Sequence, residues 1–157
     1  MPKQLPIITN PNPILRKKSL EISADKINSR EFQELLLDME ETMIKKDGAG
    51  LAAPQIGQNI RALVVSDGKK TLFLINPQIT KKSWAREIAE EGCLSVLNDQ
   101  GEIIYALVER YKKINCVYWN KKGLKTKLKA DKMLARVIQH EVDHLDGILF
   151  IDKIAKK

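Results

Sequence analysis

The chain contains only two histidines, and both lie in the five-residue stretch His140-Glu141-Val142-Asp143-His144. Side chains four residues apart stand on the same face of an α-helix, so the two imidazoles can converge on one cation. The glutamate beside the first histidine can then reach a water molecule held by that cation. Chance produces this arrangement in roughly one of a thousand random placements. The motif therefore indicates a metal-binding helix, and an ordinary helix with two hydrogen-bonded histidines is the alternative.

The residues around this motif have the pattern of a single helix. Asp131 is suited to be its N-cap, and Gly147 is a typical stop after the last turn. Apolar residues recur between them at helical spacing, namely Met133, Leu134, Val137, Ile138, Val142 and Leu145. Val137 falls along the same side of this helix as the two histidines.

A catalytic metal site of this type takes three protein ligands and leaves one position for water. The thirteen residues after His144 contain no His, Glu or Cys, and their carboxylates Asp146 and Asp152 lie too near the helix end to be good ligands. Upstream, Cys116 lies in an alternating run typical of a strand, where a free cysteine is a small apolar side chain. Cys93 instead lies between a glycine and a serine with acidic residues beside it. We therefore expect Cys93 to complete a His2Cys site.

A third motif, GAGLAAPQIG at residues 48–57, holds three glycines and three alanines. Such a segment lets the backbone approach another chain or a ligand closely, although a C-cap followed by a tight connection is the simpler interpretation. Together and in this order, GAGLAAPQ, EGCLS and HEVDH resemble the signature of the peptide deformylase family. The resemblance extends over nearly the whole chain, including residues 7–16.

The resemblance implies an enzyme that removes the N-formyl group from the formyl-methionine of nascent bacterial-type proteins. It implies that Cys93, His140 and His144 are the metal ligands, and that Glu141 is the general base and acid. General chemistry agrees, because a metal-bound water becomes a nucleophile near neutral pH and a neighbouring carboxylate can pass its proton to the leaving amine.

The resemblance also assigns residues that bind the substrate. Gln55 would stabilise the developing oxyanion through its side-chain amide, together with the backbone N–H of Leu94. Gly50 would bind the substrate through its backbone. The residues implied to lie near the pocket for the methionine side chain are Ala49, Met133 and Val137.

The ligand chemistry would accept zinc, cobalt, nickel or iron. The resemblance implies one Fe2+ per chain, for which Zn2+, Ni2+ or Co2+ can substitute. The sequence departs from the family at Leu97, where a proline is usual, and residues 96–108 are longer than in many relatives. This departure leaves the shape of the substrate-side loop open and does not touch the metal ligands, the base or the oxyanion donors.

The rest of the chain predicts an α+β fold, with antiparallel or mixed sheets packed around a central helix that carries HEVDH. A helix is expected from a cap at Asn28 or Ser29 through Met43, with Glu31 completing a capping box and Gly48 ending it. Strand-like runs lie at residues 62–65, 72–75, 103–108, 114–119 and 124–129, with a hairpin turn at 121–123.

Length and composition predict one catalytic domain, residues 1–157, because 157 residues with 43% hydrophobic content suffice for one core. No apolar run approaches the ~20 residues that cross a bilayer, and the first residues lack the apolar stretch of a signal peptide. Two cysteines do not make a disulfide framework. We expect a cytoplasmic monomer with no membrane partner.

The net charge of +7 and the isoelectric point near 9.4 raise a rival interpretation, a basic zinc-stabilised nucleic-acid-binding module. Against it, only 5% of residues are aromatic and the ligand set is one short of a structural zinc site. A general metalloprotease built on the same helix is the second rival. The basic surface fits a weak attraction to the ribosome without any specific nucleic-acid sequence, and solvation alone would explain it equally well.

Overall fold

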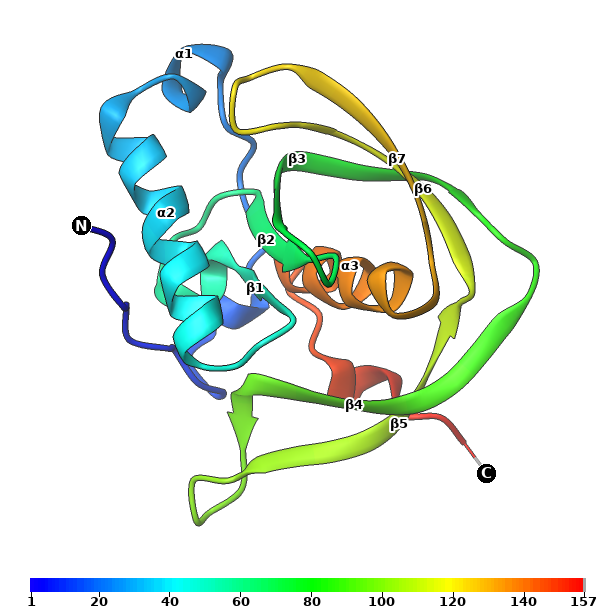
Figure 1. The fold of residues 1–157 in the computed structure, drawn as a ribbon. Coiled ribbons are helices and arrows are strands. Elements are labelled where there is room, and N and C mark those ends of the chain that lie inside the picture. Colours follow the sequence, from blue (N-terminus) through cyan, green and yellow to red (C-terminus); the bar gives the residue numbers. More distant parts are fainter. Residues whose placement is uncertain (157) are drawn as a thin grey trace.

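Two antiparallel sheets and three α-helices make up residues 1–156, the part of the chain that the computed structural model describes (Figure 1). The strands are β1 Gly50–Ala52, β2 Ala62–Ser66, β3 Thr71–Lys82, β4 Arg86–Leu97, β5 Ile103–Tyr111, β6 Lys113–Trp119 and β7 Lys125–Asp131. The α-helices are α1 Ala24–Ile27, α2 Arg30–Lys45 and α3 Lys132–Leu145. Single 3-10 turns lie at Pro13–Arg16, Ala53–Ile56 and Phe150–Lys153.

The larger sheet has the strand order β1-β2-β3-β6-β7, and β4 and β5 form a separate long hairpin. α3 packs against one face of the larger sheet in a core that includes Leu63, Leu74, Ile114 and Ile138. α2 packs against the other face of the same sheet at the end formed by β1, β2 and β3. α3 therefore lies inside the molecule, between the larger sheet and the β4–β5 hairpin (Figure 1).

This architecture confirms the expected α+β class, with antiparallel sheets around a central helix. The expected strand runs are all present, and the run at 72–75 is part of a longer strand that continues to Lys82. Two strands, β1 and β4, were not expected. β1 has only three residues, and β4 carries charged residues on both faces, so neither shows the alternation of apolar and polar residues that predicts a strand.

Ser29 and Asp131 stand at the N-cap positions of α2 and α3 as predicted, but the capping box at Glu31 is wrong. Ser29 caps α2 by accepting a hydrogen bond from the backbone N–H of Phe32, so Phe32 occupies the third helical position and Glu31 cannot complete a capping box. Asp131 precedes α3 but its side chain makes no capping hydrogen bond. Asp131 is also the last residue of β7, and the chain turns directly into α3 at Lys132, whose φ is +52°.

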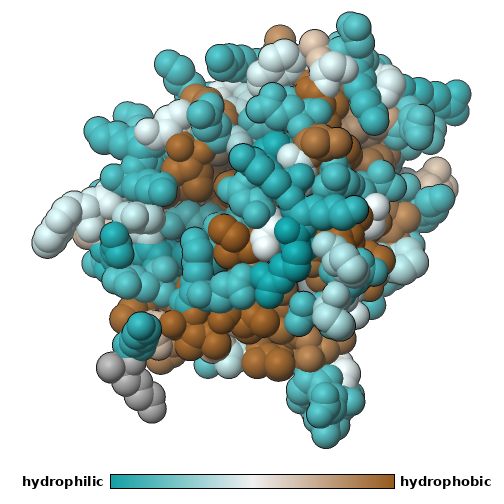
Figure 2. Space-filling view, turned by 180° about the vertical axis from the view of Figure 1, so that it is seen from behind, coloured by the Kyte–Doolittle hydropathy of each residue, from teal (hydrophilic) through white to brown (hydrophobic). Residues whose placement is uncertain are grey.

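Hydrophilic side chains cover most of the side of the molecule seen in Figure 2, and an apolar band follows its lower rim. The β4–β5 hairpin and the C-terminal segment lie at that rim in Figure 1. Large apolar residues exposed on these elements are Ile88, Ile104, Tyr105, Leu107 and Ile154. Among residues 1–156, no helix combines the length and the apolar composition that a membrane crossing needs.

Gly147 offers a test of how α3 is joined to the N-terminal segment. Its φ is +77°, and an added Cβ would lie 2.4 Å from the carbonyl oxygen of Arg16. Gly147→Ala should therefore lower the free energy of unfolding by roughly 3 kcal/mol or more, measured by urea denaturation. Gly101→Ala is the matched control, because Gly101 has φ +78° and open space around its Cβ position, and it should cost only about 1 kcal/mol. Equal losses would show that the contact with Arg16 is unimportant.

Candidate metal centre

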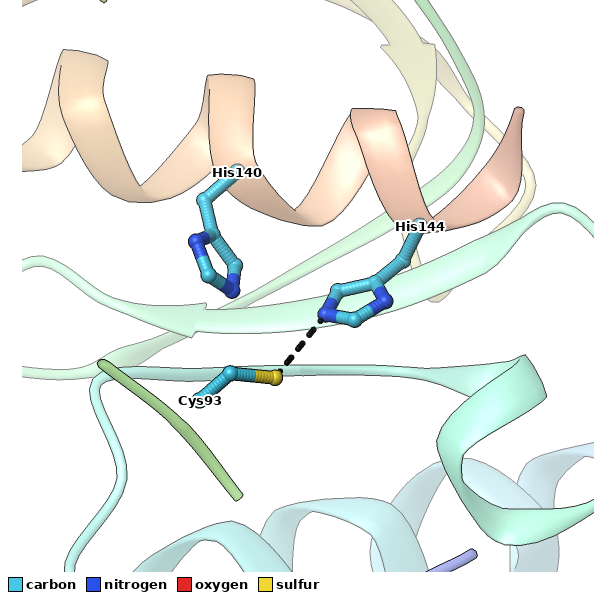
Figure 3. A group of neighbouring side chains, drawn as sticks. All are labelled: Cys93, His140 and His144. Carbon is cyan, nitrogen blue, oxygen red and sulfur yellow. Dashed lines mark hydrogen bonds between the residues drawn. The ribbon is translucent and has the colours of Figure 1, made fainter. Parts of the chain in front are cut away.

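Cys93, His140 and His144 lie together although β4 and α3 are far apart in the sequence (Figure 3). One ligand atom from each residue lies within 4.8 Å of the other two, and Cys93 Sγ is 3.3 Å from His144 Nε2. Both imidazoles point from α3 toward the cysteine in Figure 3. The register of β4 with β5 shifts between Gly92 and Leu97, so the ladder is irregular where Cys93 faces the helix.

The surroundings of His140 suit a cation. His140 Nδ1 lies 2.8 Å from Glu91 Oε1, so an N–H at Nδ1 donates to that carboxylate and Nε2 is left for a metal. Burial opposes a charge on His140, but Glu141, Cys93 and Glu91 raise its pKa to about 10. The ring therefore stands among negative groups, and a metal ion at Nε2 would replace one of its protons.

Glu91 is buried and is held by two buried arginines. Arg110 donates to it from Nε and Nη2 at 2.9 and 3.0 Å, and Arg136 donates from Nη1 at 2.6 Å. Burial alone would raise the pKa of Glu91, but hydrogen bonds from His140 and Arg110 outweigh it and lower that pKa well below the ordinary value. Arg110 also binds Asp143 of the HEVDH stretch. Glu91 therefore stays ionised and fixes His140.

The sequence did not single out Glu91, Arg110 or Arg136. The one signal for Glu91 is its place two residues before Cys93, which puts both on the same face once β4 is known to be a strand, and the sequence did not predict that strand. The two arginines could not have been found, because they reach Glu91 across separations of 19 and 45 residues.

Glu141 lies beside the three potential ligands and is only 4% exposed. Burial raises its pKa to about 7, and no residue of the described chain makes a hydrogen bond to its Oε1. A carboxyl group with a pKa near neutrality can both accept and donate a proton. Gly50 leaves room for it, since an added Cβ would lie 2.8 Å from Glu141 Oε2 and 2.9 Å from Val137 Cγ1.

Gln55 holds its amide toward the cysteine. Its Oε1 accepts from the backbone N–H of Ala52 at 2.9 Å, which turns Nε2 toward Ser95 Oγ at 3.0 Å and Cys93 Sγ at 3.6 Å. Leu94 follows Cys93 in the irregular part of β4, and its side chain packs toward the α2 core. The side-chain amide of Gln55 and the backbone of Leu94 thus both lie next to Cys93.

A cavity of about 240 Å³ opens beside these groups. Of the residues singled out from the sequence, Ala49, Gly50, Gln55, Cys93, Leu94, Met133, Val137, His140 and Glu141 line it. His144 does not line it and is only 1% exposed. The loop left open by the sequence is an extension of the β4–β5 hairpin in which Leu97 pairs with Ile103, and it brings Ile103 and Tyr105 to the cavity.

The family model described as polypeptide deformylase matches residues 4–157. The peptide deformylase of Pseudothermotoga lettingae is 46% identical over 143 residues, which cover 91% of this chain and 78% of that protein. The peptide deformylase of Alkaliphilus metalliredigens is 43% identical over 151 residues, which cover 96% and 97%.

Solved peptide deformylases have the same fold. The crystal structure from Thermotoga maritima matches with a TM-score of 0.90 at 37% identity, covering 98% of this chain and 99% of that one. The Met-Ala-Ser-bound crystal structure of the class I type b enzyme from Acinetobacter baumannii matches with a TM-score of 0.90 at 32% identity, covering 98% and 100%. With a family model that spans nearly the whole chain and relatives that match most of it, this protein belongs to the peptide deformylase family, whose members are metal-dependent hydrolases that remove the N-formyl group from nascent peptides.

Proposed function

We propose that the cavity between β1, β4 and α3 is where this chain deformylates its substrates, with Cys93, His140 and His144 as the metal ligands. The observation that carries the proposal is the convergence of these three donors beside the cavity, with Glu141 next to them. An imidazole pair and one thiol make a set that leaves one coordination position for water or substrate.

The metal that we propose is one Fe2+ per chain, with Zn2+, Ni2+ or Co2+ as substitutes, following the family resemblance. The residues fit such an ion, because Glu91 fixes the Nδ1 proton of His140 and two imidazoles and a thiol are ligands that these metals accept. When bound, the metal lowers the pKa of a water molecule and polarises the formyl carbonyl. Metal analysis of protein purified without air should find iron at about one equivalent.

The protein side chains supply the proton transfers and the oxyanion contacts in this proposal. Glu141 takes the proton of the attacking water and later gives it to the leaving amine, which suits a buried carboxyl with a pKa near 7. Gln55 Nε2 and the N–H of Leu94 donate to the developing oxyanion. Because Oε1 of Gln55 is already bound to Ala52, the amide is oriented before the substrate arrives.

We propose formyl-methionyl peptides as substrates of this cavity. Gly50 would bind the peptide through its backbone, and Ala49, Met133 and Val137 would surround the methionine side chain. The related Acinetobacter baumannii enzyme was crystallised with Met-Ala-Ser, a peptide that begins with methionine.

The remaining expectations belong to the same proposal. We infer that one catalytic domain, residues 1–157, acts as a cytoplasmic monomer, although Lys157 lies outside the described residues. Weak association with the ribosome would bring the enzyme to nascent chains.

The test of the function is release of formate from formyl-Met-Ala-Ser by the iron-loaded protein. We expect rapid release of formate and no cleavage of unformylated Met-Ala-Ser. Cleavage of internal peptide bonds in unformylated peptides would favour a general metalloprotease. No formate release from metal-loaded, folded protein would overturn the proposal.

Glu141 and His144 should separate the base from a ligand. Glu141→Gln removes the proton acceptor and keeps the three ligands, so kcat should fall by about 10²–10⁴-fold while bound metal stays near one equivalent. His144→Ala removes a ligand, so bound metal itself should be lost. Formate release and metal content are measured on the same samples, and equal metal loss in both variants would refute the assignment.

The two cysteines provide a matched pair. Cys93→Ser should remove the metal or weaken its binding, because a serine hydroxyl is a poor substitute for a thiolate ligand. Cys116 lies 1% exposed in the α3 core, where burial raises the pKa of its thiol to about 11. Cys116→Ser should therefore keep both metal and activity and cost only about 1–2 kcal/mol of unfolding free energy. Full activity in Cys93→Ser would end the ligand assignment.

Gln55 tests the oxyanion contact. If its amide binds the oxyanion more tightly than the ground-state carbonyl, Gln55→Ala should lower kcat by roughly 10²–10³-fold with little change in KM, and the metal should stay. Leu94→Met keeps the backbone N–H and should be far milder. A rise in KM alone for Gln55→Ala would instead make Gln55 a substrate-holding residue.

A further inference from the structure

The outer face of the larger sheet carries a row of lysines away from the cavity. β6 and β7 pair so that Lys125, Lys127 and Lys129 lie opposite Trp119, Val117 and Asn115, on the face that does not pack against α3. Lys81 on β3 pairs with Asn115, and Lys113 on β6 lies at the end of the same face. We call Lys81, Lys113, Lys125, Lys127 and Lys129 the lysine face, and all five are exposed.

Acidic residues are almost absent from this region. Residues 68–86 and 110–130 contain thirteen Lys and Arg and no Asp or Glu, which leaves fourteen cations against twenty carboxylates in the rest of the chain. The positive net charge of +7 therefore comes from these two segments. Asp131, opposite Lys113, is the one carboxylate on β3, β6 and β7. Within residues 1–156, the lysine face takes part in no salt bridge with side chains.

An exposed tryptophan stands at the edge of the lysine face. Trp84 is 97% exposed in the turn between β3 and β4. The preceding residue, Ser83, is tied to Lys113 by two hydrogen bonds, from Ser83 N–H to the Lys113 carbonyl at 2.9 Å and from Lys113 N–H to Ser83 Oγ at 3.1 Å. A large aromatic ring is thus held beside the basic surface without being buried.

We propose that the lysine face and Trp84 bind RNA, with the lysines on backbone phosphates and the indole stacked on a base. Alternate lysines on β7 stand about 7 Å apart along an extended strand, which makes a line of charge that a polynucleotide backbone can follow. Aromatic stacking beside such a line is how proteins hold single-stranded RNA without reading its sequence. The proposal rests on the proposed function, because nascent chains emerge from a ribosome whose surface is rich in RNA.

RNA fits this surface better than the alternatives. One alternative is that the lysines on β7 protect an edge strand from pairing with other chains. That role would not require lysines on the inner strands, such as Lys81 and Lys113, and it would not require carboxylates to be absent. A lipid surface would require several apolar side chains among the charges, whereas Gln78, Asn115 and the half-buried Val117 lie between these lysines. α3 packs against the other face of this sheet (Figure 1). No residue of the lysine face lines the cavity, so an occupied lysine face leaves the cavity open.

The test measures binding of the iron-loaded full chain to a fluorescent oligouridine RNA by anisotropy across a salt series. Five phosphate contacts predict a log-log salt slope of about −3.5. The triple variant Lys125→Gln, Lys127→Gln, Lys129→Gln should lower affinity at least tenfold and bring the slope to about −1.4. Trp84→Ala should weaken binding about tenfold and leave the slope unchanged.

The matched control is the triple variant Lys3→Gln, Lys17→Gln, Lys18→Gln, which removes the same charge from exposed positions elsewhere. It should bind RNA nearly as well as the unchanged protein. Equal loss in both triples would show a net-charge effect and overturn the proposal. So would absence of RNA binding, or binding confined to phosphatidylglycerol vesicles.

Formate release from free formyl-Met-Ala-Ser separates this proposal from the proposed function. All variants should keep that activity within about twofold, because none of the substituted residues lines the cavity. Loss of activity in the unchanged protein would refute the proposed function and leave the RNA comparison decisive for the lysine face.

Discussion

The buried carboxylate of Glu91 is the contact on which the candidate site depends, because it joins β4, β5 and α3 at one point. An ionised carboxylate in the interior is costly unless it is fully paired, and here Arg110, Arg136 and His140 all donate to it. Each partner comes from a different place: Arg110 from β5, and Arg136 and His140 from successive turns of α3. Breaking one contact would leave an unpaired charge inside the protein, so the hairpin and the helix hold a fixed relative position.

That fixed position explains how a short strand segment and a helix can share a metal. Cys93 lies in the part of β4 where pairing with β5 is irregular, two residues beyond Glu91. The same strand therefore orients an imidazole through Glu91 and offers a thiol through Cys93. On the opposite wall, Gly50 lets β1 approach Glu141 more closely than any residue with a side chain would allow. Asp143 of the HEVDH stretch also supports the site, because it binds Arg110, the arginine of β5 that holds Glu91.

The local parts of this arrangement could be predicted from the sequence, and the non-local parts could not. α3 follows from apolar periodicity and a glycine stop, and the candidate ligands follow from histidine spacing and the residues around Cys93. β4 was missed because Glu87, Glu90 and Glu91 hide any alternation, and a buried Glu91 makes sense only once two distant arginines are placed beside it. The predicted capping box is wrong because of a shift of one residue. A capping box needs a glutamate three residues after the cap, and with the cap at Ser29 instead of Asn28 that position is no longer Glu31.

The sheet that supports α3 has two faces with different chemistry. Its inner face is apolar and positions the helix, whereas its outer face is covered by α2 at the β1–β2 end and carries lysines at the β6–β7 end. Period-two alternation makes this division possible, because Leu128 and Ala130 of β7 join the core under α3 whereas Lys125, Lys127 and Lys129 lie on the other face. Charge on the outer face can therefore change without disturbing the packing that holds His140 and His144. The lysine face and the cavity can therefore change independently, since no residue of the lysine face lines the cavity.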